Sequence, residues 1–139
     1  MKIHQLSLFL ENKPGQMTAP CHLLADAGIN IRTLTLADTQ HFGILRMIVS
    51  DWRRSLELLE QAGYAVKVTE VVALEVGDHP GGLAGLLDRL DEAGINVEYM
   101  YAFTFGRHDR AVLIFRFDQP DAALECLRGS GVAVLPGVE

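Results

Sequence analysis

Alternating apolar and polar residues open the chain, and a helical spacing follows them. Leucine occupies every second position over Leu6–Leu10, which is typical of a strand with one buried face. Met17, Cys21 and Leu24 then recur at the spacing of one helix face. Further along, the pattern predicts strands over 30–37, 42–50 and 64–69 and a helix over 52–62. This first unit therefore has the order βαββαβ.

Turn and capping residues indicate where these elements end. Pro20 fits a helix only near its start, where the missing N–H has no intrahelical partner. Gly28 is placed to end that helix, and Asp51 to cap the N-terminus of the next one. In the second half of the chain we expect Asp118 to cap a last helix that carries Pro120 early and ends near residue 129.

The second half of the chain repeats the first. Pro14-Gly15 recurs as Pro80-Gly81, and Ala27-Gly28-Ile29-Asn30 recurs as Ala93-Gly94-Ile95-Asn96, both at one constant offset. Ile48 is matched to Ile114 at the same offset, and the register is expected to slip by about two residues after residue 117. The second copy is expected to hold strands over 71–76, 97–105, 110–117 and 132–135, with a helix face over 83–93.

The repeat predicts the fold class and the domain organisation. Two copies at one long offset indicate a duplicated small domain rather than a solenoid. We expect an α+β protein of two ferredoxin-like βαββαβ sandwiches in tandem, each with an antiparallel sheet, over residues 1–70 and 71–139. Residues 65–72 contain no Gly, Pro or Ser, so no linker is expected between the copies, and we expect the two units not to separate.

Composition and charge exclude several classes of protein. The 139 residues are 49% hydrophobic and 22% charged, which fits a soluble globular chain and excludes disorder. Apolar runs stay well short of the ~18 residues of a membrane span. The net charge of −6, with no basic run longer than Arg53-Arg54, argues against nucleic acid as a partner. The chain start lacks a secretory pattern, and Cys21 and Cys126 lack metal-ligand spacing, so we expect a cytoplasmic protein without metal or cofactor.

The middle strands of the second copy are apolar on both faces. Tyr99, Tyr101 and Phe103 share one face, and Met100 and Ala102 share the other. Because helices cover only one face of such a sheet, the second face is expected to be covered by the other unit or by another chain. The alternative is that these side chains are exposed singly. The pattern favours at least a homodimer or tight burial between units. In the first copy, the positions equivalent to Tyr99, Tyr101 and Phe103 are Thr33, Thr35 and Ala37.

Two motifs, each present twice, resemble a known family. One is the Pro-Gly turn of residues 10–15 and its copy at 76–81, and the other is the Ala-Gly-Ile-Asn segment after the helix. Together they resemble ACT domains, ferredoxin-like regulatory modules that bind amino acids and control metabolic enzymes. The resemblance covers essentially the whole chain, and residues 42–46 and 98–101 are similar to stand-alone tandem members from bacteria.

The motif has a physical chemistry of its own. The Pro-Gly turn opens a helix whose first N–H groups are unpaired, and Gly15 and Gly81 carry no Cβ to keep a ligand carboxylate away. The Asn12 side chain has both a donor and an acceptor for an amino acid. The resemblance implies that the polar residue before the turn and the Asn opening the second strand contact the ligand across a domain interface. The candidate ligand-binding residues are Asn12, Pro14, Gly15, Asn30, Asp78, Gly81 and Asn96.

The chain also departs from the family pattern. Serine-binding members carry a His where this chain has Leu10 and Val76, and Asp78 adds a negative charge that would repel a carboxylate. Structural explanations exist for the same residues. Asn30 and Asn96 tolerate left-handed backbone after the glycine, and Asp78 is placed to cap its helix.

The resulting hypothesis is a non-catalytic regulatory protein that binds a free amino acid at an interface between ACT-like units. Its expected partners are a second copy of the chain and a metabolic enzyme. A pure interaction module without a ligand is an alternative. A small ferredoxin-like enzyme is a further alternative, which the lack of any paired acid–base constellation disfavours.

Residues 106–110 are expected to form a charged hairpin tip.

Overall fold

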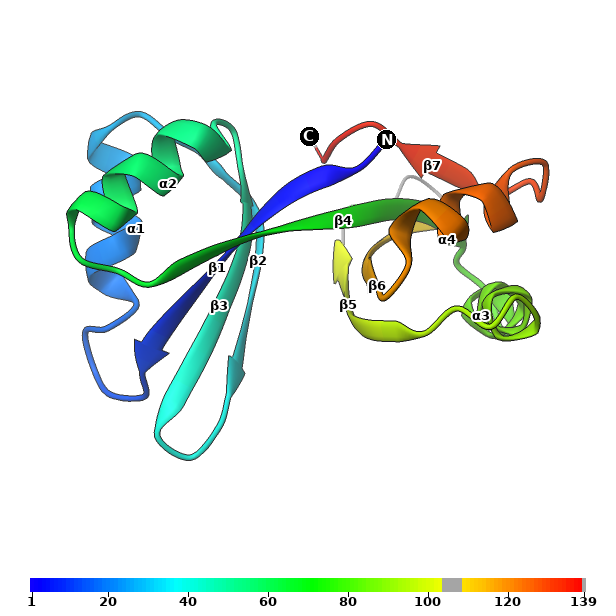
Figure 1. The fold of residues 1–139 in the computed structure, drawn as a ribbon, viewed down its shortest axis with the longest axis horizontal. Helices are drawn as coiled ribbons and strands as arrows, with labels where there is room; N and C mark the ends of the chain where they lie inside the picture. The colour runs from blue at the N-terminus through cyan, green and yellow to red at the C-terminus, as the bar shows by residue number, and fades with distance from the viewer. Residues whose placement is uncertain (104–108, 139) are drawn as a thin grey trace. The chain divides into compact units, whose positions relative to one another are not determined.

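The computed structural model describes residues 1–103 and 109–138, and these form two compact units (Figure 1). The first unit consists of residues 4–69, and the second unit consists of residues 70–138 together with residues 1–3. The elements of the first unit are β1 (Ile3–Glu11), α1 (Thr18–Asp26), β2 (Ile31–Asp38), β3 (Phe42–Val49), α2 (Trp52–Gln61) and the start of β4 (Val66–Gly77). Those of the second are the rest of β4, α3 (Gly82–Glu92), β5 (Val97–Phe103), β6 (Arg110–Phe117), α4 (Pro120–Leu127) and β7 (Ala133–Leu135).

This element order is βαββαβ twice, so the expected α+β class with tandem ferredoxin-like units is confirmed. In the first unit β3 lies between β2 and β1, antiparallel to both. Helices α1 and α2 lie together against this sheet (Figure 1). Their leucines Leu24 and Leu59 pack with the alternating leucines of β1 and with Leu45 of β3 in one buried core.

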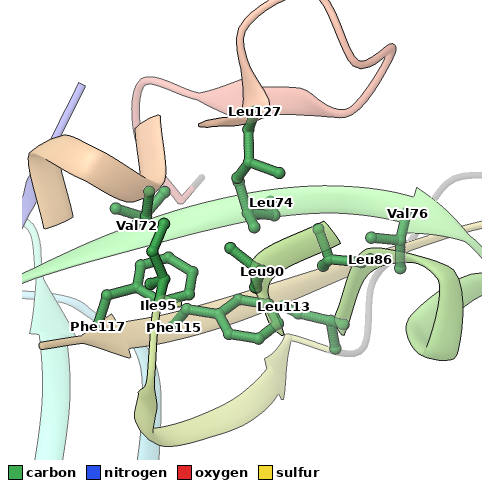
Figure 2. Packing of buried hydrophobic residues seen from close by; sticks show 11 residues of the cluster. Val72, Leu74, Val76, Leu86, Leu90, Ile95, Leu113, Phe115, Phe117 and Leu127 are labelled. Carbon is green, nitrogen blue, oxygen red and sulfur yellow. The ribbon is translucent and has the colours of Figure 1, made fainter. Parts of the chain in front are cut away.

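The second unit is built in the same way. Its sheet has the order β7-β4-β6-β5 with antiparallel neighbours. Figure 2 shows the core of this unit, in which Leu86 and Leu90 of α3 meet Phe115 and the apolar residues of β4. At the α3 end of this core, Leu86 lies beside Val76 (Figure 2).

Most of the expected element ends are confirmed. Pro20 is buried in the first turn of α1, and Gly28 follows the last turn with φ of 73°. Asp51 caps α2, because its Oδ1 accepts from the N–H of Arg54 at 3.1 Å. The expectation for Asp118 is wrong. Gln119 occupies the N-cap position of α4, and the Asp118 carboxylate accepts from the N–H of Asn96 at 2.9 Å instead.

Strand pairing also corrects the alignment of the two copies. Leu8 pairs with Leu45 in the first unit, whereas the equivalent Leu74 pairs with Leu113 in the second. The offset between the copies is therefore longer for β3 against β6 than for β1 against β4, by two positions. Matching Ile48 to Ile114 is wrong, because the two extra residues enter before β6 rather than after residue 117.

The join between the copies is a single strand. The sequence predicts strands on either side of residue 70, and the structure has one unbroken strand of 12 residues, β4. Its first residues belong to the first unit and the rest to the second. The prediction that no linker separates the copies is confirmed.

Side chains on the helix-free faces differ between the two units. In the first unit Phe9 and Phe42 are exposed by 49% and 56%. In the second unit Tyr99, Tyr101 and Phe103 are half-buried, and Ile114 beside Tyr101 is fully buried. Residues 106–108 of the expected charged hairpin tip lie outside the described residues.

Candidate functional site

The first Pro-Gly turn is held by its backbone. The N–H of Asn12 donates to the carbonyl of His41 at 2.9 Å, which ties the turn to the β2–β3 hairpin. Gly15 has φ of 86°, a left-handed conformation that favours glycine. The Asn12 side chain is exposed, and the neighbouring Lys13 ammonium is paired with Glu11 at 2.9 Å. Asn12 is therefore exposed on a turn whose backbone is bonded to the neighbouring hairpin.

A small hollow lies beside this turn. Its volume is about 70 Å³, and its lining residues come from the end of β1, from the turn that leads up to α1, and from β2 and β3. Asn12 shares it with Leu36, Asp38 and Gly43, of which sequence reasoning singled out none as site residues. Pro14 and Gly15 belong to the turn but do not line the hollow.

Asn30 lies at the other end of α1. Its N–H donates to Ser50 Oγ at 3.0 Å, and its carbonyl accepts from the N–H of Ser50 at 2.9 Å. The intervening helix has 9 residues, a rise of about 13 Å. Asn12 and Asn30 of one copy therefore do not form one site, and their expected meeting across an interface stays a prediction.

The second copy repeats this geometry with other side chains. The N–H of Asp78 donates to the carbonyl of Asp109, as that of Asn12 does to His41. The N–H of Asn96 donates to Asp118 Oδ1, and its carbonyl accepts from the N–H of Asp118, as Asn30 does with the side chain and N–H of Ser50. The left-handed residue of that segment is Gly94, two positions before Asn96.

Asp78 does not cap α3. The N-cap residue is Gly81, with φ of 88°, so the capping explanation for Asp78 is wrong. The turn is also tightly closed at its far end, because a Cβ on Gly82 would overlap the carbonyl oxygen of Gly77. Asp78 is exposed beside this turn, and its role in ligand binding stays a prediction.

A larger cavity in the second unit was missed by the sequence analysis. Its volume is about 280 Å³, and it lies between the end of β4, the first half of α3 and residues 131–132. Of the candidate residues only Gly81 lines it. Its charged side chains are Glu75, Arg89 and Arg110, and Arg110 Nε donates to Glu75 Oε1 at 3.0 Å. These residues belong to no motif, since β4, α3 and β6 bring them together only in the fold.

Comparison with known proteins identifies the family. A family model described as an ACT domain pair matches residues 1–132. The chain belongs to the ACT domain pair family. Protein BT0572 from Bacteroides thetaiotaomicron is 38% identical, with 97% of this chain and 92% of that chain covered and a TM-score of 0.90. A search of curated proteins found no match.

More distant solved structures share the fold of this ACT pair. The regulatory subunit of aspartate kinase from Thermus thermophilus, in its ligand-free form, is 19% identical over 92% of both chains, with a TM-score of 0.66. The corresponding subunit from Thermus flavus is 16% identical over 92% of both chains, with a TM-score of 0.65. At these identities the likeness concerns the fold alone.

Across residues 1–103 and 109–138, no group of three or more His, Cys, Asp and Glu side chains is arranged to hold a metal ion. None of the helices described here combines the length and apolar character that crossing a membrane would require.

Proposed function

We propose that this ACT pair is a non-catalytic regulatory protein that binds a free amino acid and controls a metabolic enzyme. The observation that carries the proposal is the repeated geometry of the turn. In both copies a polar residue, Asn12 or Asp78, follows the first strand and donates its N–H to the hairpin beside it. A glycine with positive φ then precedes the next helix. Such a turn leaves helix N–H groups open to a carboxylate.

The amino acid is proposed to lie at an interface between ACT units. Within one copy, Asn12 and Asn30 are separated by the length of α1. A ligand that contacts both kinds of residue therefore needs two units. Binding that favours one arrangement of units over another would shift their equilibrium, which is the physical basis of regulation.

A homodimer is part of this proposal. Phe9 and Phe42 are exposed on the helix-free face of the first unit, and Leu34 and Leu36 are exposed on its edge strand β2. Exposed apolar side chains on an unpaired strand edge favour association with another chain. In the second unit, Tyr99, Tyr101 and Phe103 offer a further apolar surface.

The relatives support regulation rather than catalysis. Two proteins of the same fold are named as regulatory subunits of aspartate kinase. We take the present chain to control a metabolic enzyme in the cytoplasm.

An interaction module without a ligand is the second candidate. The exposed Phe9 and Phe42 favour it, because they suit a protein partner better than a polar metabolite. A thermal-shift screen against the twenty amino acids separates the two. A ligand at 100 times its Kd stabilises by about 2.7 kcal/mol, which raises the Tm by several degrees. No shift at millimolar concentration with any amino acid would favour the interaction module.

A further inference from the structure

A groove lies between the end of α4, β7 and Met1 in the second unit. We call it the α4 groove. Its volume is about 410 Å³, and it is open to solvent. Every residue of its lining belongs to the second unit, so the groove does not depend on an interface between units. It is also separate from both Pro-Gly turns, because none of the candidate ligand-binding residues lines it.

The lining of the α4 groove is apolar. Met1 is exposed by 62%, and the apolar residues on the walls are half-buried. Leu127 is buried at the bottom, where its side chain points toward Leu74 in the core (Figure 2). The apolar lining residues are Met1, Leu124, Leu127, Val132 and Val134. An open apolar surface of this kind marks a place where another molecule binds.

The path of the chain after the helix opens the groove. In the first copy the N–H of Tyr64 donates to the carbonyl of Leu59 at 3.0 Å, which holds the chain against the end of α2. In the second copy the equivalent N–H, that of Val132, donates to Ser130 Oγ at 3.2 Å. The carbonyl of Leu127 accepts from the N–H of Ser130 at 3.1 Å instead. A bond within the loop therefore replaces the bond that joins helix end and strand.

The side chains differ between the copies at the same place. Ser50 and Asp118 make equivalent bonds, and the alignment that matches them places Val132 where the first copy has Tyr64. The first copy forms the same helix and strand with the aromatic residue. The fold therefore does not require a small residue at this position, and the valine leaves the place of a ring open.

The charge of the protein is concentrated on the unit that carries the groove. Residues 4–69 contain six Lys or Arg residues and six Asp or Glu residues, so their formal charge is zero. The whole formal charge of −6 falls on residues 1–3 and 70–139. A field of this sign attracts a positively charged partner toward the second unit.

Acidic side chains of α4 stand beside the groove. The side chains of Asp121 and Glu125 are exposed by 83% and 70%. Both lie within one helical turn of Leu124, which lines the groove. They are paired with Lys2 and Arg128, but exposed ion pairs are weak, so cations of a partner can take their place.

We propose that the α4 groove binds a basic amphipathic helix of another protein. Such a helix places its apolar side chains in a groove, and its lysines or arginines meet the carboxylates of α4. The inference rests on the proposed function, because it gives the regulated enzyme a surface at which to dock. The docking surface and the proposed amino-acid site share no residue.

A fluorescently labelled synthetic peptide of leucine and lysine, with the leucines on one helix face, is the probe. Anisotropy measures its binding to the whole chain. We expect binding in the micromolar range that weakens as the salt concentration rises. The same peptide with glutamate in place of lysine should bind at least tenfold more weakly, because the second unit repels it.

Two variants import residues of the first copy into the groove region. Val132→Tyr fills the groove with the residue that the first copy has there, and it should weaken peptide binding at least tenfold. Asp121→Arg introduces the residue of the equivalent position 53, and it should weaken binding several-fold. Their matched controls are Ala84→Tyr and Asp88→Arg, which make the same changes at exposed positions of α3 outside the lining. Both controls should bind the peptide about as well as the unchanged protein does.

Three results would overturn the proposal. One is the absence of binding by the leucine–lysine peptide, and another is equal binding by Val132→Tyr and Ala84→Tyr. The third is self-association of the chain that Val132→Tyr abolishes in the absence of peptide binding, which would make a second copy the occupant. Thermal shifts by amino acids, measured on the same variants, separate this test from the proposed function. A shift kept in Val132→Tyr while peptide binding is lost supports both proposals, whereas peptide binding without any shift overturns the amino-acid site alone.

Discussion

The N–H of Asn96 donates to Asp118 Oδ1 at 2.9 Å, and the N–H of Asp118 donates back to the Asn96 carbonyl at 3.1 Å. Asn30 and Ser50 make the same pair of bonds in the first unit, at 3.0 and 2.9 Å. The link joins the start of the second strand to the end of the third in each copy. It also explains why a residue expected to cap a helix is used by a strand instead.

Removing the Asp118 carboxylate should destabilise the second unit. Asp118→Ala loses one charge-assisted hydrogen bond at an exposed site, and we expect a loss of about 1 kcal/mol. Asp118→Ser is the matched control, because the first copy makes this bond with Ser50. Chemical denaturation should rank the serine variant above the alanine variant. Equal stability of the two variants would show that the bond contributes nothing.

Lys2 predicts a pH dependence of stability. Its ammonium lies 3.0 Å from Asp121 and 3.5 Å from Glu70. The hydrogen bond with Asp121, aided by the charges of both carboxylates, raises the pKa of Lys2 above 10.5. A raised pKa means that the stabilisation is complete below about pH 10 and is lost as the pH rises through the folded value.

Comparison with Lys2→Met tests this. The variant should have a slightly lower Tm at neutral pH, because the ion pairs are exposed and contribute little each. The difference in Tm between the two proteins should shrink above pH 10.5, the ordinary value for lysine. A difference that is constant across this range would contradict a role for the charge.

Two glycines of the second copy should respond in opposite ways to alanine. Gly81 has φ of 88°, a conformation that costs an alanine about 1–2 kcal/mol. Gly85 has ordinary helical backbone and open space around it, so Gly85→Ala should stabilise the protein by up to about 1 kcal/mol. Thermal unfolding of both variants checks the signs. Destabilisation by Gly85→Ala would indicate a packing role for this glycine that the structure does not show.

The join should be sensitive to length. An inserted glycine between Thr69 and Glu70 moves the following strand by one residue, which turns its apolar face outward unless the pairing shifts. We expect a clear loss of Tm, and a smaller loss for the same insertion after Gln40, in an exposed turn. Equal effects of the two insertions would show that the register of β4 is not fixed by its neighbours.

The fold could be predicted because the internal repeat is visible in the sequence. The Pro-Gly turn and the Ala-Gly-Ile-Asn segment recur at one offset, and glycine at the helix ends is a local signal. The alternating leucines of β1 marked a buried face that the structure confirms. Turns and amphipathic faces depend on neighbouring residues, which is why they could be read without coordinates.

The cavity of about 280 Å³ in the second unit could not be predicted in this way. Arg110 and Glu75 are 35 residues apart in sequence, and only the pairing of β4 with β6 brings them together. Two extra residues before β6 also obscured the match between Arg110 and Phe42. A comparison of the two copies along the strands would have shown that Arg110 and Glu75 stand where the first copy has Phe42 and Phe9. The signal lay in the differences between the copies, whereas the motifs lay in their identities.

The most direct test of the central claim uses the amino acid that stabilises the protein most. This amino acid is titrated into the unchanged protein and into Asn12→Ala, and the two affinities are compared. The Asn12 turn is held by backbone bonds, so the variant should keep its Tm without ligand. Loss of a hydrogen bond to a charged ligand group, worth roughly 1.5–3 kcal/mol, should weaken binding at least tenfold. Unchanged affinity in Asn12→Ala, or the absence of any stabilising amino acid, would contradict the account.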